Sequence, residues 1–168
     1  RTKGLKNFEI KVYKVDFVIL CLSKTDLSNI RNVNLTGIKS SFSKKITLNN
    51  VSDDIMVTSI EAPVKKKGAY LVVLKSDELE TSGIILISNI RAEIQPDVSG
   101  RVRVLVRDKN GKRIAKAKTF FVGSYAKKVH RATTDLRGFS EAEGVMGIPI
   151  VFGEYNGNYI FYRGRYVI

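Results

Sequence analysis

The chain has 168 residues, of which 43% are apolar, enough for one large folded domain or two small ones. No stretch approaches the roughly 18 to 20 consecutive apolar residues of a membrane-spanning helix. One cysteine and one histidine exclude an internal disulfide and a four-ligand zinc site. Lysine and arginine outnumber aspartate and glutamate by 29 to 16, and the net charge of +13 permits attraction to nucleic acid, anionic lipid or acidic proteins. Because the chain begins at Arg1 without a basic and apolar leader, we expect a mature product or a piece of a longer protein.

The first half of the chain carries patterns typical of β-strands. Residues 8–15 alternate apolar and polar side chains, whereas residues 16–23 fit either a strand or a short amphipathic helix ending near Lys24. Further strands are expected at residues 32–38, 45–48, 55–60, 69–74 and 83–94, with a polar hairpin connection at residues 75–82. These strands predict a meander.

The second half predicts a separate set of short strands. Turn-forming residues gather at 95–100, where Pro96 cannot donate to a central ladder, so we expect the chain to leave one sheet and enter another there. In residues 101–107 arginines alternate with apolar side chains, and Asn110-Gly111 then suits a two-residue hairpin turn. Other strands are expected at residues 112–122, 129–133, 148–153 and 159–163.

Regular short strands with little helix predict an all-β fold of two consecutive immunoglobulin/fibronectin-III-like β-sandwich modules. We place the first module at residues 1–90 and the second at residues 91–168.

No residue pattern indicates a reaction. Cys21 lies in an apolar run and is expected to be a small buried side chain, since His130, the only possible imidazole base, comes more than a hundred positions later. The Asp-Lys-Asn-Gly sequence beginning at Asp108 lacks the later acidic ligands of a calcium loop and predicts a turn. Glu141 and Glu143 share one face of a strand and are expected to be solvated. We therefore expect no catalytic, cofactor-binding or metal-binding residue.

The aromatic residues near the end of the chain have two interpretations. Tyr159 and Phe161 face one way along a strand, while Ile160 and Tyr162 face the other. Burying one set would close the second sandwich, and this interpretation is favoured over a surface that stacks bases or sugars.

Clusters of basic residues lie near predicted turns or on outward strand positions. Solvated charge and protection of edge strands explain them most simply, with a polyanion site as the alternative. The candidate partner-binding residues are Lys65, Lys66, Lys67, Lys112, Arg113, Lys127, Lys128 and Arg131.

Four segments occur in an order that resembles bacterial alpha-2-macroglobulin-like proteins, in particular the large extracytoplasmic forms of planctomycete-type bacteria. They are residues 8–16 with Val-Tyr-Lys-Val-Asp, residues 68–73 (Gly-Ala-Tyr-Leu-Val-Val), residues 100–104 (Gly-Arg-Val-Arg-Val) and residues 134–138 (Thr-Asp-Leu-Arg-Gly). The resemblance implies a macroglobulin-like first module and a macroglobulin-like or carboxypeptidase-regulatory-like second module. It also implies a longer parent protein in the periplasm, at the cell surface or secreted.

The reactive chemistry of that family does not transfer. Its thioester is built from a Cys-Gly-Glu-Gln segment, but Cys21 is followed by Leu-Ser-Lys. We therefore expect a non-catalytic structural or protein-interaction module without cofactors, whose partners are other domains of the parent or other envelope proteins. The alternative is a basic module that binds nucleic acid or an acidic cell-surface polymer with steep salt dependence.

Overall fold

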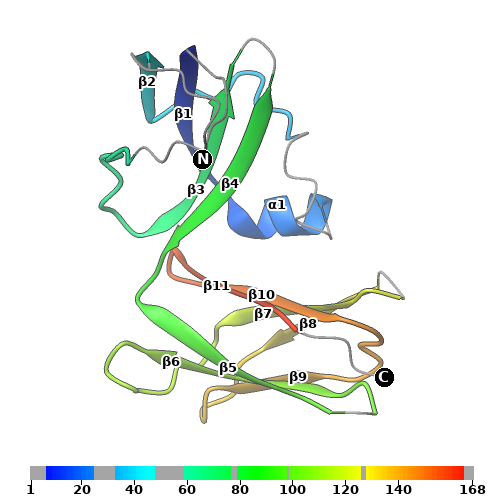
Figure 1. Cartoon of the computed structure of the whole chain (residues 1–168). Coiled ribbons are helices and arrows are strands. Elements are labelled where there is room, and N and C mark those ends of the chain that lie inside the picture. The colour runs from blue at the N-terminus through cyan, green and yellow to red at the C-terminus, as the bar shows by residue number, and fades with distance from the viewer. Residues whose placement is uncertain are drawn as a thin grey trace.

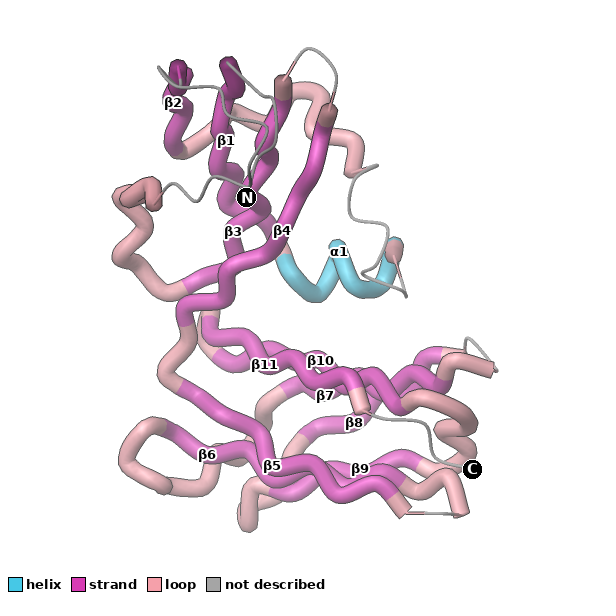
Figure 2. Tube along the Cα trace, viewed as in Figure 1, coloured by secondary structure: helices cyan, strands magenta, loops and turns pink. Residues whose placement is uncertain are grey.

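The computed structural model describes a chain whose regular structure is almost entirely β-strand (Figures 1 and 2). The described residues are 7–24, 33–47, 59–76, 79–97, 99–125 and 128–164. They contain helix α1 (Phe17–Ser23) and the strands β1 (Asn7–Val15), β2 (Phe42–Thr47), β3 (Gly68–Lys75), β4 (Glu80–Ile87), β5 (Ile90–Pro96), β6 (Val102–Asp108), β7 (Lys118–Gly123), β8 (Val129–Thr133), β9 (Phe139–Ala142), β10 (Pro149–Tyr155) and β11 (Asn158–Arg163). The expected all-β class is confirmed.

Strands β1 to β4 form one antiparallel sheet in the order β2-β1-β3-β4. Phe8, Ile10 and Val12 alternate along β1 and are buried on one face of this sheet, as period-two patterning requires. Ile60 and Val64, from the segment before β3, pack against the same core. The predicted meander is wrong, because β1 lies between β2 and β3 instead of at an edge.

Part of one expected strand of this half is replaced by a turn. At residues 33–38 the Asn34 side chain accepts a hydrogen bond from the backbone N–H of Thr36 at 3.0 Å, and the Ile38 N–H donates to the Leu35 carbonyl at 3.0 Å. Such local bonds compete with a strand ladder. Residues 59 and 60 likewise form no strand, while residues 32, 48 and 55–58 lie outside the described residues.

Helix α1 settles the ambiguity of residues 16–23 in favour of a helix. Asp16 is the N-cap, and its side chain accepts from the Ile19 N–H at 3.0 Å, which satisfies one of the free amides of the first turn. Phe17, Leu20 and Cys21 recur at helical spacing and are all buried. The opposite side is in solvent, with Ile19 65% exposed.

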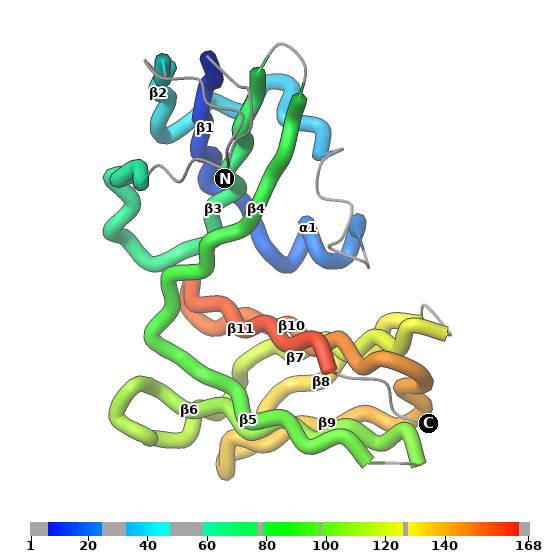
Figure 3. The backbone as a smooth tube through the Cα atoms, in the orientation of Figure 1, coloured from blue at the N-terminus to red at the C-terminus, as the bar shows by residue number. Residues whose placement is uncertain are grey.

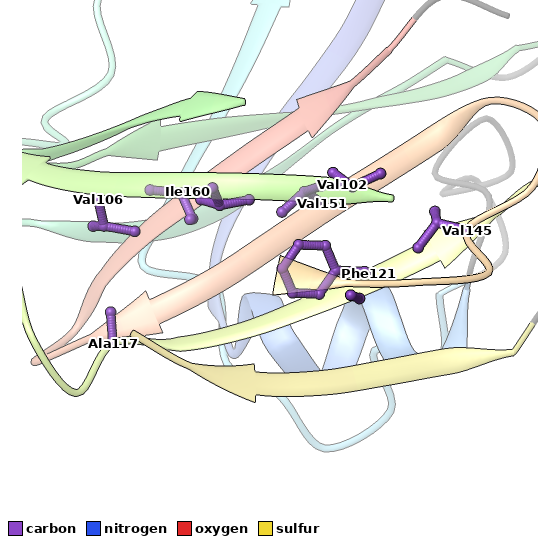
Figure 4. Close-up of a cluster of buried hydrophobic side chains, with 9 residues drawn as sticks. Val102, Val106, Ala117, Phe121, Val145, Val151 and Ile160 are labelled. Atoms are coloured by element: carbon purple, nitrogen blue, oxygen red, sulfur yellow. The ribbon is translucent and has the colours of Figure 1, made fainter. Parts of the chain in front are cut away.

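Strands β5 to β11 form a two-layer sandwich. One sheet has the order β11-β10-β7-β8 and the other has the order β5-β6-β9, so the chain changes sheet between β6 and β7, β8 and β9, and β9 and β10. This arrangement is fibronectin-III-like, as expected. The core between the sheets is made of Val102, Val104, Val106, Ala117, Phe121, Ala142, Val145, Val151 and Ile160, most of which Figure 4 labels.

Three details of the predicted second half are wrong. The connection between Pro96 and Val102 does not join two sheets but closes the hairpin between β5 and β6, and the chain changes sheet at residues 88–89 (Figure 3). Pro96 is tolerated because β5 is an edge strand. The predicted strand at 112–122 begins only at Lys118, because residues 112–117 cross from one sheet to the other after a single bridge at Arg113. The short strand β9 was not foreseen.

The turn at Asn110-Gly111 forms, but with a different geometry from the one predicted. Only Gly111 has a positive φ, at 85°. Its N–H donates to the Asp108 carbonyl at 3.0 Å, and the Asp108 carboxylate accepts from the N–H groups of Asn110 and Lys112. The geometry is therefore a three-residue loop ending in a glycine bulge.

Candidate interaction surfaces

An apolar interface joins the first sheet and its helix to the sandwich. In Figure 1, α1 lies between the β1–β4 sheet and strands β10 and β11, and α1 contacts β10. The buried residues of this interface cluster are Phe17, Cys21, Ala69, Phe120, Val122, Ile150 and Phe152. They come from both halves of the chain, so the halves are joined by side-chain packing and not only by the peptide at residues 88–89.

The interface explains why β7 and β10 are buried on both faces. Along β10, Val151 points into the sandwich core, whereas Ile150 and Phe152 point toward α1. Phe120 of β7 stacks on Phe152 with ring centroids 5.0 Å apart and an interplanar angle of 7°. A strand that is covered on both faces has a continuous run of apolar residues in its sequence, instead of alternating apolar and polar residues.

The late aromatic residues divide between the two cores. Ile160 and Tyr162 pack in the sandwich, which agrees with the interpretation of a final strand. The other set is used as well, because the Phe17 ring meets Tyr159 at 5.7 Å and Phe161 at 5.8 Å in edge-to-face geometry. Such pairs stabilise a contact beyond the area that they bury.

Polar contacts fix the same junction. Lys67 Nζ donates to the Asn156 carbonyl in the β10–β11 turn at 2.8 Å. The Asn89 N–H donates to Oδ1 of the buried Asn158 at 3.0 Å, and the Asn158 amide donates to the Tyr155 carbonyl at 3.1 Å. Asn158 is thus satisfied from both sides, which a buried amide requires.

Cys21 is a packing residue of the interface. It is 2% exposed, and burial raises the pKa of its thiol to about 12, so the nucleophilic thiolate does not form at neutral pH. The expectation of a buried side chain is confirmed. The described residues hold no group of three or more His, Cys, Asp or Glu side chains placed to bind a metal ion.

Those predicted basic residues that the structure describes are not gathered into one site. Lys65, Lys66 and Lys67 precede β3 in the first half. Lys112 and Arg113 lie before β7 and Lys128 lies after it, which places them toward opposite ends of that strand, while Arg131 pairs with Phe120 in the middle of β8. Lys127 lies outside the described residues.

A different set of charged residues does come together, on the outer face of the β5-β6-β9 sheet. Arg101 and Arg103 both donate to Oε2 of Glu141, at 2.8 and 3.1 Å, and these bonds lower the pKa of the Glu141 carboxyl. Nε of Arg107 lies 3.1 Å from Oε1 of Glu93. Glu141 is therefore a surface ion-pair residue, and it contacts arginines instead of Glu143.

Phe139, on the edge strand β9, lies on the same face. The guanidinium groups of Arg103, Arg113 and Arg137 each lie 5.9 Å from the centroid of its ring, a cation–π distance. Of these arginines only Arg113 is among the candidate residues predicted from the sequence. The alternation of Arg103 and Arg107 was visible in the sequence, but placing Arg137 and Phe139 beside them requires the unforeseen strand β9.

No family model matches the sequence, and no curated protein matches it either. Among solved structures, the fold is similar to a segment of native alpha-2-macroglobulin from Escherichia coli spanning domains NIE and MG1. The TM-score is 0.68 at 13% identity, and the match covers 96% of this chain and 85% of that one. A segment spanning domains MG0, NIE and MG1 matches with a TM-score of 0.70 at 13% identity over 96% of this chain, which spans 56% of that segment. The resemblance expected from the sequence is confirmed at the level of the fold. No helix in the described parts of the chain is long and apolar enough to cross a membrane.

Proposed function

We propose that this chain is a rigid, non-catalytic structural unit of a larger extracytoplasmic macroglobulin-like protein, in which two modules that divide near residue 90 hold neighbouring domains in a fixed orientation. The observation that carries the proposal is the apolar interface between the modules. Phe17, Cys21 and Phe152 are each no more than 2% exposed there. A junction of this kind resists the hinge motion that is the default between domains with small polar contacts.

The comparison supports the same conclusion. The similar E. coli segment matches both modules of this chain together, with 96% of the chain aligned. One superposition over both modules requires that the modules have a similar relative placement in the two proteins. Modules that moved independently would not keep such a placement. Other domains of the same parent are then the first partners of this unit.

The alternative, a polyanion-binding module, rests on the net charge of +13. It predicts binding that falls steeply with salt, because counterions are released on association. The distribution of the lysine clusters over both modules favours the structural role, because a continuous polyanion site needs the basic residues on one surface.

The test is recovery of the parent protein from the envelope fraction of its source cells, with an antibody raised against this chain. We expect a polypeptide much larger than 18.8 kDa, the mass of this chain, with protein partners that remain bound at high salt and after nuclease treatment. Recovery of a polypeptide of only this size, or loss of all partners with salt or nuclease, would contradict the structural role.

A further inference from the structure

On the outer face of the β5-β6-β9 sheet, residues paired across neighbouring strands form rows that run perpendicular to the strands, and one of these rows is entirely basic. Inward residues of β5 and β6 fill the sandwich core, so Arg91 and Arg107 face outward, and their Cα atoms are directly paired. Arg107 is bridged in turn to Arg113 on its other side. Arg91, Arg107 and Arg113, hereafter the arginine row, therefore stand side by side across three segments of chain.

The other two rows of the same face carry little net charge, zero in one and −1 in the other. One contains Gln95, Arg103 and Glu141, and the other contains Glu93, Leu105 and Phe139. Leu105 is only 7% exposed although it is not part of the sandwich core. The face thus joins a small apolar centre to a strongly basic border.

The arginine row has too few carboxylates for its charge. Glu93, beside Arg107, is the acidic partner of this row, whereas Arg91 and Arg113 take part in no ion pair within the described ranges. Like charges directly opposite one another in a sheet destabilise it. The row is therefore an unfavourable arrangement for the free chain, and a carboxylate from outside would relieve it.

We propose that the arginine row docks an extended acidic segment of a protein partner, whose carboxylates pair with Arg91 and Arg113 while an apolar side chain of the segment rests on Phe139. This inference rests on the proposed function, since it names the chemistry of a partner of the structural unit. Guanidinium groups bind carboxylates with two parallel hydrogen bonds, which favours arginine over lysine at such a site.

The same face argues against nucleic acid as the occupant. Glu93 lies in the row next to the arginine row and Glu141 in the row beyond it, so a nucleic acid backbone, with one charge per phosphate along its length, would meet these carboxylates as well as the arginines. A protein segment can place neutral or apolar residues opposite the two glutamates. Carboxylates on alternate residues of an extended segment are spaced about 6.8 Å, within reach of neighbouring arginine side chains.

The test uses the full chain and a fluorescent hexapeptide of alternating glutamate and valine, followed by fluorescence anisotropy. The variant is Arg91→Gln with Arg113→Gln, and the matched control is Lys65→Gln with Lys66→Gln, which removes the same charge from the first module. We expect the control to bind the peptide like the unmodified chain. We expect the arginine variant to bind about tenfold more weakly, because two partly exposed ion pairs are lost.

Equal affinity of the arginine variant and the unmodified chain would overturn the proposal, as would no binding of the peptide by the unmodified chain. A third result would also overturn it: the unmodified chain binds a 12-nucleotide oligothymidylate more tightly than the peptide, and the lysine control and the arginine variant weaken that oligonucleotide binding equally. Thermal unfolding of the arginine variant at or above the temperature of the unmodified chain shows that weaker binding is not misfolding. None of these outcomes bears on the size or salt resistance of the parent complex, so the structural role is tested separately.

Discussion

Removing the Phe17 side chain is expected to open the interface between the modules while leaving the sandwich folded. Phe17 is 1% exposed and makes two edge-to-face contacts, with Tyr159 and Phe161. Replacing a buried phenylalanine by alanine costs about 3–5 kcal/mol. If this cost falls on the interface, the equilibrium for opening it rises at least about 100-fold, since each 1.4 kcal/mol is a factor of ten.

Cys21 provides the assay, because it is the single cysteine of the chain and is buried in this interface. Its thiol has a pKa of about 12 while the interface is closed, so a thiol-reactive probe at pH 8 reacts with the open form. The labelling rate of Phe17→Ala should therefore exceed that of the unmodified chain by at least about 100-fold. Hydrogen exchange of the β6 amides reports the state of the sandwich in the same sample.

Phe121→Ala is the matched control, because Phe121 is 0% exposed but packs only in the sandwich core. It should accelerate hydrogen exchange in β6 and leave Cys21 labelling close to that of the unmodified chain. If the two variants instead accelerate labelling and β6 exchange equally, the modules unfold as one unit and the reasoning that assigns the Phe17 energy to a separate interface is refuted.

Three further predictions concern the turns and the arginine row. Gly138→Ala should lower the free energy of unfolding by more than Gly111→Ala in urea titrations: both glycines have positive φ, which costs about 1–2 kcal/mol for other residues, but a Cβ at Gly138 would also lie 2.9 Å from the Val106 carbonyl oxygen, whereas one at Gly111 meets open space. Equal losses would contradict this steric argument. Backbone hydrogen bonds, from Ser99 and from Phe139 respectively, lower the pKa of the Asp97 and Asp135 carboxyls, so the stability that these carboxylates contribute is present above the usual carboxyl pKa and is lost as the pH falls through the lowered value. In thermal melts between pH 7 and pH 2, Asp135→Asn should therefore lose less stability on acidification than the unmodified chain. An identical pH profile would be evidence against this linkage. Arg91→Gln should raise the free energy of unfolding by about 0.5 kcal/mol in urea, because it removes a like charge opposite Arg107, and a loss of stability would show that the row is not repulsive in the free chain.

Local patterning predicted the strands that have one buried and one solvated face. In β6 the inward residues Val102, Val104 and Val106 alternate with arginine, and the strand lies where the pattern placed it. The helix was recognised as an alternative because Phe17, Leu20 and Cys21 have helical spacing. These features depend on residues that are close in sequence.

Features that depend on distant contacts were missed. The strand at residues 139–142 is short and carries Ser140 and Glu141, and its pairing with β6 is what marks it as a strand. Residues 112–117 carry the composition of a strand but cross between sheets. The interface between the modules could not be foreseen either, since no local signal states which face of β10 meets α1.

One local repeat was overlooked, although it was visible in the sequence. Asp-x-x-Gly begins at Asp97, Asp108 and Asp135, and each copy forms the same turn, in which the glycine N–H donates to the aspartate carbonyl and the aspartate side chain accepts a backbone amide two residues on. The three glycines have φ between 78° and 85°. Two of these turns border β6, and the third leads into β9, so a single turn type sets the ends of the basic sheet.

The positions of the arginines on this sheet argue that they do more than keep the chain in solution. Solubility needs charge on the surface but places no requirement on which residues are opposite each other, and alternating arginine with glutamate, as at Arg103 and Glu141, satisfies it without repulsion. The arginine row instead sets three like charges side by side. The outer face of the other sheet is already covered by α1 and the first module. The basic face is thus the sandwich surface left for a partner, and it has a charge distribution that is better satisfied in a complex than in the free chain.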